Sequence, residues 1–227
     1  TRAVAWGLDH HFDRMDELEE AGRQPAVEKQ SGAWHQEAKS SIHYHHKLGV
    51  DSLVEGRYIP AIKPQSNTVY VKAPQGCGKT EWVGKVALPF YRQRHPESRV
   101  LYVVHRRSMA RAAADRLGLP CYMDTQGGLK HDCVVSVDSL HRVRLDEDTQ
   151  LILVLDEVEQ VIHHLTLSGT MNGEQKLRAH NAWLSVLSHA VAMVCMDADL
   201  GALTIKEVQE HAPPHLGSSS QGHLIEV

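Results

Sequence analysis

A glycine-rich segment that ends in lysine and threonine carries the strongest chemical signal in the sequence, at residues 73–80. It follows an apolar run of strand length and precedes a helical stretch, which is the setting of a phosphate-binding loop. Gly76 and Gly78 let backbone N–H groups approach phosphate oxygens. Lys79 is placed to reach the β and γ phosphates, and Thr80 can ligate Mg²⁺. The predicted binding residues for ATP are Ala73, Pro74, Gln75, Gly76, Cys77, Gly78, Lys79 and Thr80.

Two adjacent carboxylates follow a second apolar run, LILVL at residues 151–155. In NTPases with a phosphate-binding loop, a buried strand delivers a carboxylate at its end to hold Mg²⁺. Asp156 is therefore the predicted Mg²⁺ ligand together with Thr80. Glu157 is the predicted general base that polarises the attacking water, so Lys79 and Glu157 are the predicted catalytic residues.

Three further polar clusters also follow runs of strand length, at residues 105–108, 138–142 and 197–199. Open parallel sheets bind their ligands at the carboxyl ends of the strands, so we expect these clusters at the same edge as the nucleotide motifs. Arg106 and Arg107, with Arg142, are predicted to contact the phosphates of single-stranded nucleic acid. A solvated pair of charges is the alternative at Arg106 and Arg107.

The elements that must position these residues alternate between strand-length apolar runs and helical stretches. This alternation predicts an α/β fold with a mainly parallel sheet covered by helices on both faces. Ser108 is the predicted N-cap of one helix, and Gly118 is its predicted end. The predicted strands are 68–72, 99–104, 119–123, 133–137, 151–155 and 190–196, and the predicted helices are 81–91, 109–117, 174–189 and 201–211.

The composition indicates a globular chain with three parts. Its 227 residues include 42% hydrophobic and 23% charged residues, with a net charge of −4, so the chain has a core but no overall basic signature. We predict an accessory region at 1–64, with helical character at 13–21, an ATPase domain at 65–212 and a linker or tail at 213–227. No apolar run approaches the length of a membrane span, so we expect no membrane partner and a cytoplasmic location.

The cysteines and histidines do not indicate a metal site or a disulfide. The four cysteines form no CxxC pair and three lie in or next to apolar runs, so we predict reduced thiols in the core. The 17 histidines include a cluster at 43–46 but supply no complete set of zinc ligands. We therefore predict that the histidines are surface and half-buried side chains and that they do not form a metal centre.

The motifs in their order along the chain resemble one known family. APQGCGKT, VVHRRSMAR, SVDSLHR, LILVLDEVEQVIHHL and VCMDADL are similar to the N-terminal motor domain of herpesvirus-type replication-origin-binding proteins. That family is a superfamily 2 helicase group with phage and plasmid relatives, and the resemblance covers about residues 66–203. It implies a RecA-like domain in which Arg106 and Arg107 track DNA and Ser139 lies in the next DNA-side motif. Asp197 and Asp199 take the place of the motif that couples hydrolysis to movement, although DAD stands where many helicases have SAT.

The resemblance also implies what the chain works with. The expected function is the ATPase half of a DNA helicase in replication, acting on single-stranded DNA with a second RecA-like domain in cis or in trans. Other replication proteins are possible partners, and a viral origin would place the protein in the host cytoplasm or nucleus. The start at Thr1 fits a piece of a longer protein. Two alternatives remain open, a small-molecule kinase with the same loop and a non-catalytic, nucleotide-gated module that binds DNA or a partner.

Overall fold

A computed structural model describes residues 52–54, 56–167, 172–217 and 222–227. The predicted helix at 13–21, the histidine cluster at 43–46 and most of the predicted accessory region lie outside the described residues.

The described residues form a sheet of seven strands in which every neighbouring pair is parallel. The order across the sheet is β1-β7-β2-β6-β5-β3-β4. The four strands from β2 to β3 in this order are almost entirely buried, because parallel sheets are covered on both faces. The strands are β1 (Ser52–Leu53), β2 (Thr68–Lys72), β3 (Arg99–Val104), β4 (Cys133–Ser136), β5 (Leu151–Asp156), β6 (Ala190–Asp197) and β7 (His223–Glu226).

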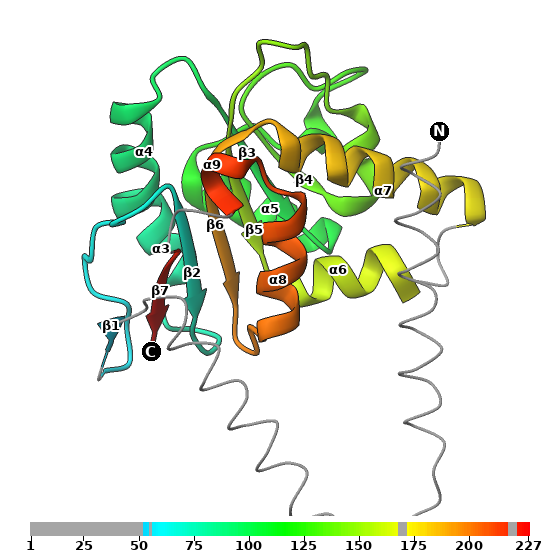
Figure 1. Ribbon diagram of the computed structural model, residues 1–227. Coiled ribbons are helices and arrows are strands. Elements are labelled where there is room, and N and C mark those ends of the chain that lie inside the picture. Colours follow the sequence, from blue (N-terminus) through cyan, green and yellow to red (C-terminus); the bar gives the residue numbers. More distant parts are fainter. Residues whose placement is uncertain (1–51, 55, 168–171, 218–221) are drawn as a thin grey trace, which may run out of the picture. The chain divides into compact units, whose positions relative to one another are not determined.

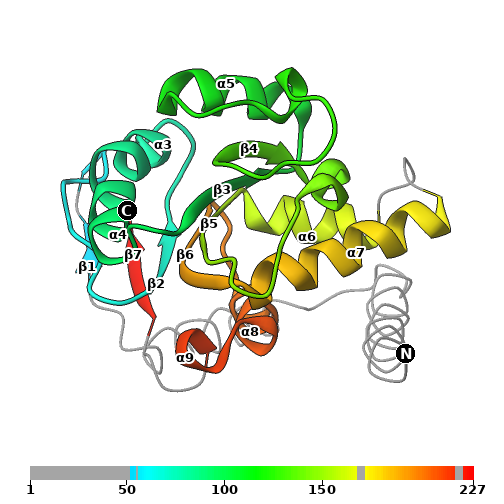
Figure 2. The same cartoon turned by 90° about the horizontal axis from the view of Figure 1, so that it is seen from above.

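Helices cover both faces of this sheet. Figure 2 shows α3, α4 and α5 on one face and α6 to α9 on the other. On the first face, the chain after β2 forms α3 (Lys79–Trp82), a π-helical turn (Val83–Ala87) and α4 (Leu88–Arg94), and α5 (Arg107–Leu117) follows β3. On the second face lie α6 (Val158–Leu167), α7 (Gly173–Ser188), α8 (Ala202–His211) and α9 (Pro214–Gly217). This architecture is the α/β fold that the sequence predicts.

Most predicted elements are confirmed, and two local predictions are wrong. Gly118 ends α5 in the left-handed conformation as predicted, but Arg106 rather than Ser108 occupies the N-cap position. At 119–123 no strand forms: Cys121 makes an isolated bridge, and Tyr122–Asp124 form a 3₁₀ turn. Pro120 explains the difference, because it has no N–H to donate and offers only its carbonyl, to Val134.

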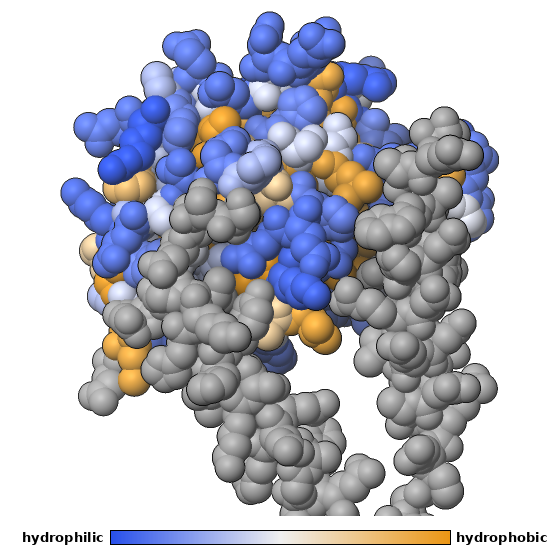
Figure 3. All heavy atoms as spheres, in the orientation of Figure 1, coloured by the Kyte–Doolittle hydropathy of each residue, from blue (hydrophilic) through white to orange (hydrophobic). Residues whose placement is uncertain are grey.

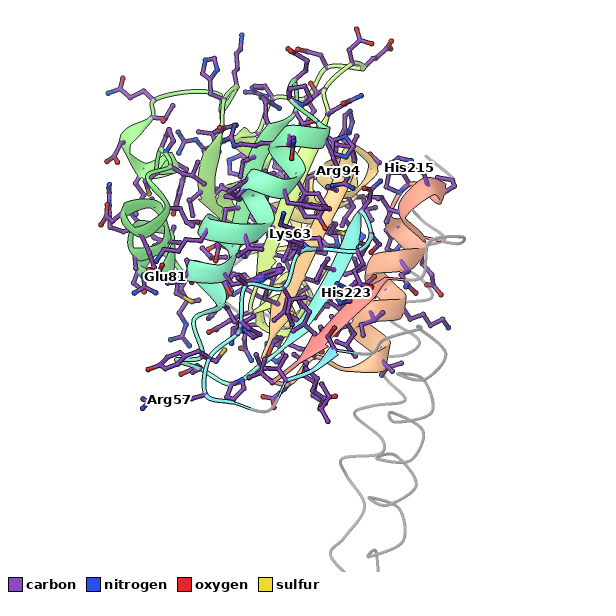
Figure 4. All side chains as sticks on the ribbon, turned by 90° about the vertical axis from the view of Figure 1, so that its left-hand side faces the viewer. Arg57, Lys63, Glu81, Arg94, His215 and His223 are labelled. Atoms are coloured by element: carbon purple, nitrogen blue, oxygen red, sulfur yellow. The ribbon has the colours of Figure 1, made fainter. Side chains whose placement is uncertain are left out.

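The tail is the largest correction to the predicted organisation. The sequence predicts a linker at 213–227, whereas residues 214–217 form α9 and His223–Glu226 form β7 within the sheet. β7 lies between β1 and β2, and Leu224 and Ile225 are fully buried. Figure 4 shows His223 on this strand. The last residues described therefore belong to the core of the domain.

The surface and the cysteines agree with a globular α/β domain. On the face seen in Figure 3, hydrophilic residues predominate and apolar ones are scattered between them. The prediction of unpaired core thiols is confirmed, because Cys77, Cys121, Cys133 and Cys195 are free and buried. Among the residues described, no helix combines the length and the apolar character that a membrane crossing requires.

Candidate nucleotide-binding site

The carboxyl ends of the strands bring the predicted motifs together at one edge of the sheet, the lower edge in Figure 1. In the strand register Lys72 is opposite Asp197, and Asp156 is opposite Met196. One strand, β6, thus separates the strand before the phosphate-binding loop from the strand that ends in Asp156. The prediction that these clusters share one edge is confirmed.

The phosphate-binding loop turns directly from β2 into α3. Gly76 and Gly78 have φ angles of 78° and 86°, a left-handed conformation that glycine adopts without a steric penalty. Lys79 begins the helix and is buried, and its Nζ donates hydrogen bonds to the carbonyls of Ala73 at 2.6 Å and Pro74 at 3.0 Å. The ammonium group is therefore held inside the curve of the loop, where a phosphate would meet it.

Asp156 is a buried carboxylate with one strong hydrogen bond. The hydroxyl of Tyr102 donates to its Oδ2 at 2.7 Å, and Thr80 also interacts with that hydroxyl. Burial raises the pKa of Asp156, and the neighbouring Glu157 raises it further, while Tyr102 and Lys79 act in the opposite direction. A divalent cation bound beside Asp156 would favour the charged form of this carboxylate, which burial disfavours. Thr80 and Asp156 offer the oxygen ligands that Mg²⁺ prefers, so they fit the role predicted for them.

Glu157 combines an unusual backbone with a histidine neighbour. Its φ of 52° is left-handed, and among the described residues it is the one non-glycine with a positive φ. Such conformations are concentrated at functional sites, where the surrounding structure maintains them. Its Oε2 lies 3.5 Å from Nδ1 of His105, a side chain only 9% exposed. Burial lowers the pKa of His105, which favours the neutral imidazole beside Glu157.

These groups line a cavity of about 220 Å³. The loop side contributes Gln75, Gly76, Gly78, Lys79 and Thr80, the end of β5 contributes Asp156 and Glu157, and α5 contributes Met109, Ala112, Ala113 and Arg116. The four residues of α5 are spaced as i, i+3, i+4 and i+7, so they form one face of the helix.

Tyr102 and this face of α5 are parts of the site that the sequence did not predict, and for His105 the sequence predicted the edge of the sheet but not the contact with Glu157. The helical spacing of the four α5 residues is visible in the sequence. Two of the four are alanines, however, and alanine is as typical of a helix face packed in the core as of one that lines a binding site. Tyr102 stands inside an apolar run, where a buried hydroxyl partner leaves no mark in the sequence.

Asp197 connects the end of β6 to the phosphate-binding loop and to α6. Its backbone carbonyl accepts from N–H of Ala73 at 2.9 Å. Its buried carboxylate accepts from the N–H groups of Glu159 at 2.9 Å and Asp199 at 3.0 Å. Glu159 in turn accepts from N–H of Gly201 at 2.7 Å. The side chain of Asp197 is thus engaged within the protein, whereas Asp199 is exposed.

The residues predicted to contact nucleic acid divide into two groups. Arg106 and Arg107 are exposed where β3 ends, and Ser139 is partly exposed in the 3₁₀ segment Val137–Arg142. Arg142 differs, because its guanidinium donates to the backbone carbonyls of Tyr122, Thr125 and Gly127. Its donors organise the loop at 122–127, and its contact with nucleic acid stays a prediction.

The sheet, the loop and the carboxylates together define an α/β domain with a phosphate-binding loop. The chain is 29% identical over 177 residues to an uncharacterised protein of Picosynechococcus sp.. This match covers 70% of the chain, and the matched region spans only 17% of the length of that relative. No protein-family model matches the chain.

Among solved structures, the chain shows partial similarity to Dbp5 from S. cerevisiae and to the helicase MrfA. A variant of Dbp5 from S. cerevisiae, bound to RNA and ADP BeF3, has a TM-score of 0.45 and 15% identity over 70% of this chain and 41% of that one. A complex of the same variant with ADP has a TM-score of 0.44 and 16% identity, over 70% of this chain and 43% of that one. The helicase MrfA has a TM-score of 0.36 and 13% identity, over 83% of this chain and 32% of that one.

Proposed function

We propose that this chain is the ATP-hydrolysing domain of a helicase-type motor that acts on single-stranded DNA. The observation that carries the proposal is that one cavity is lined by Lys79 of the phosphate-binding loop and by Asp156 and Glu157 at the end of a central strand. A cationic group in this cavity can bind the phosphates of a nucleotide. The acidic groups beside it can hold the divalent cation and accept a proton from the attacking water.

Each residue has a distinct part in this proposal. The backbone N–H groups of the loop and the ammonium group of Lys79 hold the phosphates. Thr80 and Asp156 would hold Mg²⁺, which when bound supplies positive charge to the phosphate oxygens. Glu157 accepts a proton from the water that attacks the terminal phosphate. Burial lowers the pKa of His105, and the neutral imidazole that this favours would leave the carboxylate of Glu157 free to act as the base.

The link to DNA rests on the edge of the sheet that carries the site. Arg106 and Arg107 are exposed there and would contact phosphates of a single strand. The hydrogen bonds of Asp197 join the phosphate-binding loop to α6, which is a route by which nucleotide state could reach the rest of the domain. A second RecA-like domain, in cis or in trans, would close the site, and the motif order favours a role in DNA replication.

ATP hydrolysis with and without single-stranded DNA tests this function. We expect Mg²⁺-dependent ATP binding, slow hydrolysis by the chain alone and a higher rate when single-stranded DNA is added. Lys79→Ala should abolish nucleotide binding or hydrolysis, whereas Lys85→Ala, which removes an exposed lysine paired with Glu81, should leave both unchanged. Phosphate transfer to a small acceptor would instead identify a kinase, and binding without turnover would identify a nucleotide-gated module.

A further inference from the structure

Arg116 is a second cation on the cavity that holds Lys79. It lies in the last turn of α5 and lines the cavity together with Met109, Ala112 and Ala113 of the same helix. The residue is exposed, and no hydrogen bond or ion pair from another described residue fixes its guanidinium. Its donors are therefore available to a ligand in the cavity.

Two neighbours locate the charge of Arg116 within the site. Burial raises the pKa of Tyr102, and the charge of Arg116 is a minor influence that lowers it. The Tyr102 hydroxyl donates a hydrogen bond to Asp156. The guanidinium also acts on Glu81 in the first turn of α3, where Lys85 is the main cause of a lowered pKa and Arg116 a lesser one. Figure 4 shows Glu81 on the helix that follows the loop. Arg116 therefore shares the cavity with the carboxylates of Asp156 and Glu157 and with the loop residues Lys79 and Thr80.

The charges of the site call for such a cation. A nucleoside triphosphate remains negative with its divalent cation bound, and Asp156 and Glu157 add two carboxylates to the same cavity. Lys79 and Arg116 are the cations among the residues that line it. The small side chains of Ala112 and Ala113 leave space along the helix, and a guanidinium presents donors in a planar fork that matches phosphate oxygens.

We propose that Arg116 binds the terminal phosphate of a nucleoside triphosphate and so lets this domain distinguish the triphosphate from the diphosphate. The proposal rests on the function proposed above. The terminal phosphate is the assigned target because Thr80, Asp156 and Glu157, the groups for the cation and the water, share the cavity with Arg116. The arginine would act from within the domain, in addition to any cation that a second domain supplies.

The test compares a non-hydrolysable ATP analogue, AMP-PNP, with ADP, both with Mg²⁺, by calorimetry on the full chain. Arg116→Ala should weaken AMP-PNP binding by about tenfold to a hundredfold, the effect of losing a charged hydrogen bond. ADP binding should change by less than about threefold. Arg116→Lys should give an intermediate loss, because an ammonium group keeps the charge without the fork.

The control is Arg111→Ala, which removes the same charge from the same helix where the side chain is paired with Asp124. It should leave both affinities unchanged, and thermal denaturation should show that all variants are folded. Equal weakening of AMP-PNP and ADP by Arg116→Ala, or no weakening of either, would overturn the role of Arg116 while the proposed function stands. Failure of the unaltered chain to bind either nucleotide would overturn the proposed function and this role with it.

Discussion

Glu157 has a backbone conformation that the fold requires and a side-chain carboxylate that the proposed hydrolysis requires. The left-handed φ of 52° is disfavoured for most L-residues, and the fold maintains it at the turn from β5 into α6. The carboxylate beside His105 is the group that hydrolysis requires in the proposed mechanism. Because the two requirements differ, substitutions can separate them.

Glu157→Gln should leave nucleotide binding nearly intact and remove turnover, because the amide keeps the size of the side chain but cannot accept the proton. Glu157→Asn and Glu157→Val test the backbone. Asn tolerates the left-handed region, whereas a β-branched residue does not, so we expect the Val variant to be less stable than the Asn variant by about 1–2 kcal/mol. Denaturant unfolding at fixed pH measures this difference. Equal stability of the two variants would mean that the left-handed conformation is absent in solution.

At the scale of elements, the docking of β7 depends on a close contact between the chain before it and β2. Gly222 precedes it, and a Cβ added there would lie 2.5 Å from Cε2 and 2.9 Å from Cδ2 of Tyr70. Tyr70 belongs to β2 and is fully buried, so an added Cβ would press on a ring that lies inside the core. Glycine at this position allows β7 to lie against the strand that leads into the phosphate-binding loop.

We therefore expect Gly222→Ala to destabilise the domain by about 1–3 kcal/mol, the effect of overfilling a packed core. Gly173→Ala is the control, because it makes the same change at the start of α7, where an added Cβ meets nothing within 4 Å. That variant should be neutral or slightly more stable. Thermal unfolding of both variants supplies the measurement, and a harmless Gly222→Ala would show that β7 does not dock on β2 as described.

The elements that could be predicted correctly from the sequence are those with a long pattern. The runs that lead to Lys72 and Asp156 are largely apolar, so the fold class and the two nucleotide motifs could be predicted. β7 was missed because four residues after a Gly- and Ser-rich stretch are too short to distinguish a strand from a tail. The role of Arg116 was missed because it depends on how α5 lies across the cavity, which is a tertiary relation.

At the scale of the whole molecule, the charge distribution decides how nucleic acid would bind. The chain has a net charge of −4, so an attractive field for DNA has to come from a local group of cations. Arg106 and Arg107 are exposed at the carboxyl edge of the sheet, whereas the donors of Arg142 are engaged with backbone carbonyls. Binding should therefore neutralise few phosphates, so the affinity for DNA should depend only moderately on the salt concentration.

The salt dependence of single-stranded DNA binding tests this distribution. For single strands, the slope of log affinity against log salt changes by about 0.7 for each phosphate that a protein cation neutralises. The double variant Arg106→Ala with Arg107→Ala should thus bind more weakly and show a slope that is shallower by about 1.4. The control, Arg92→Ala with Arg178→Ala, makes the same change in net charge at arginines that are paired with Asp132 and Glu174. Fluorescence anisotropy at several salt concentrations gives both slopes. Because the two double variants have the same net charge, equal slopes would show that overall charge controls binding and that Arg106 and Arg107 do not touch the phosphates.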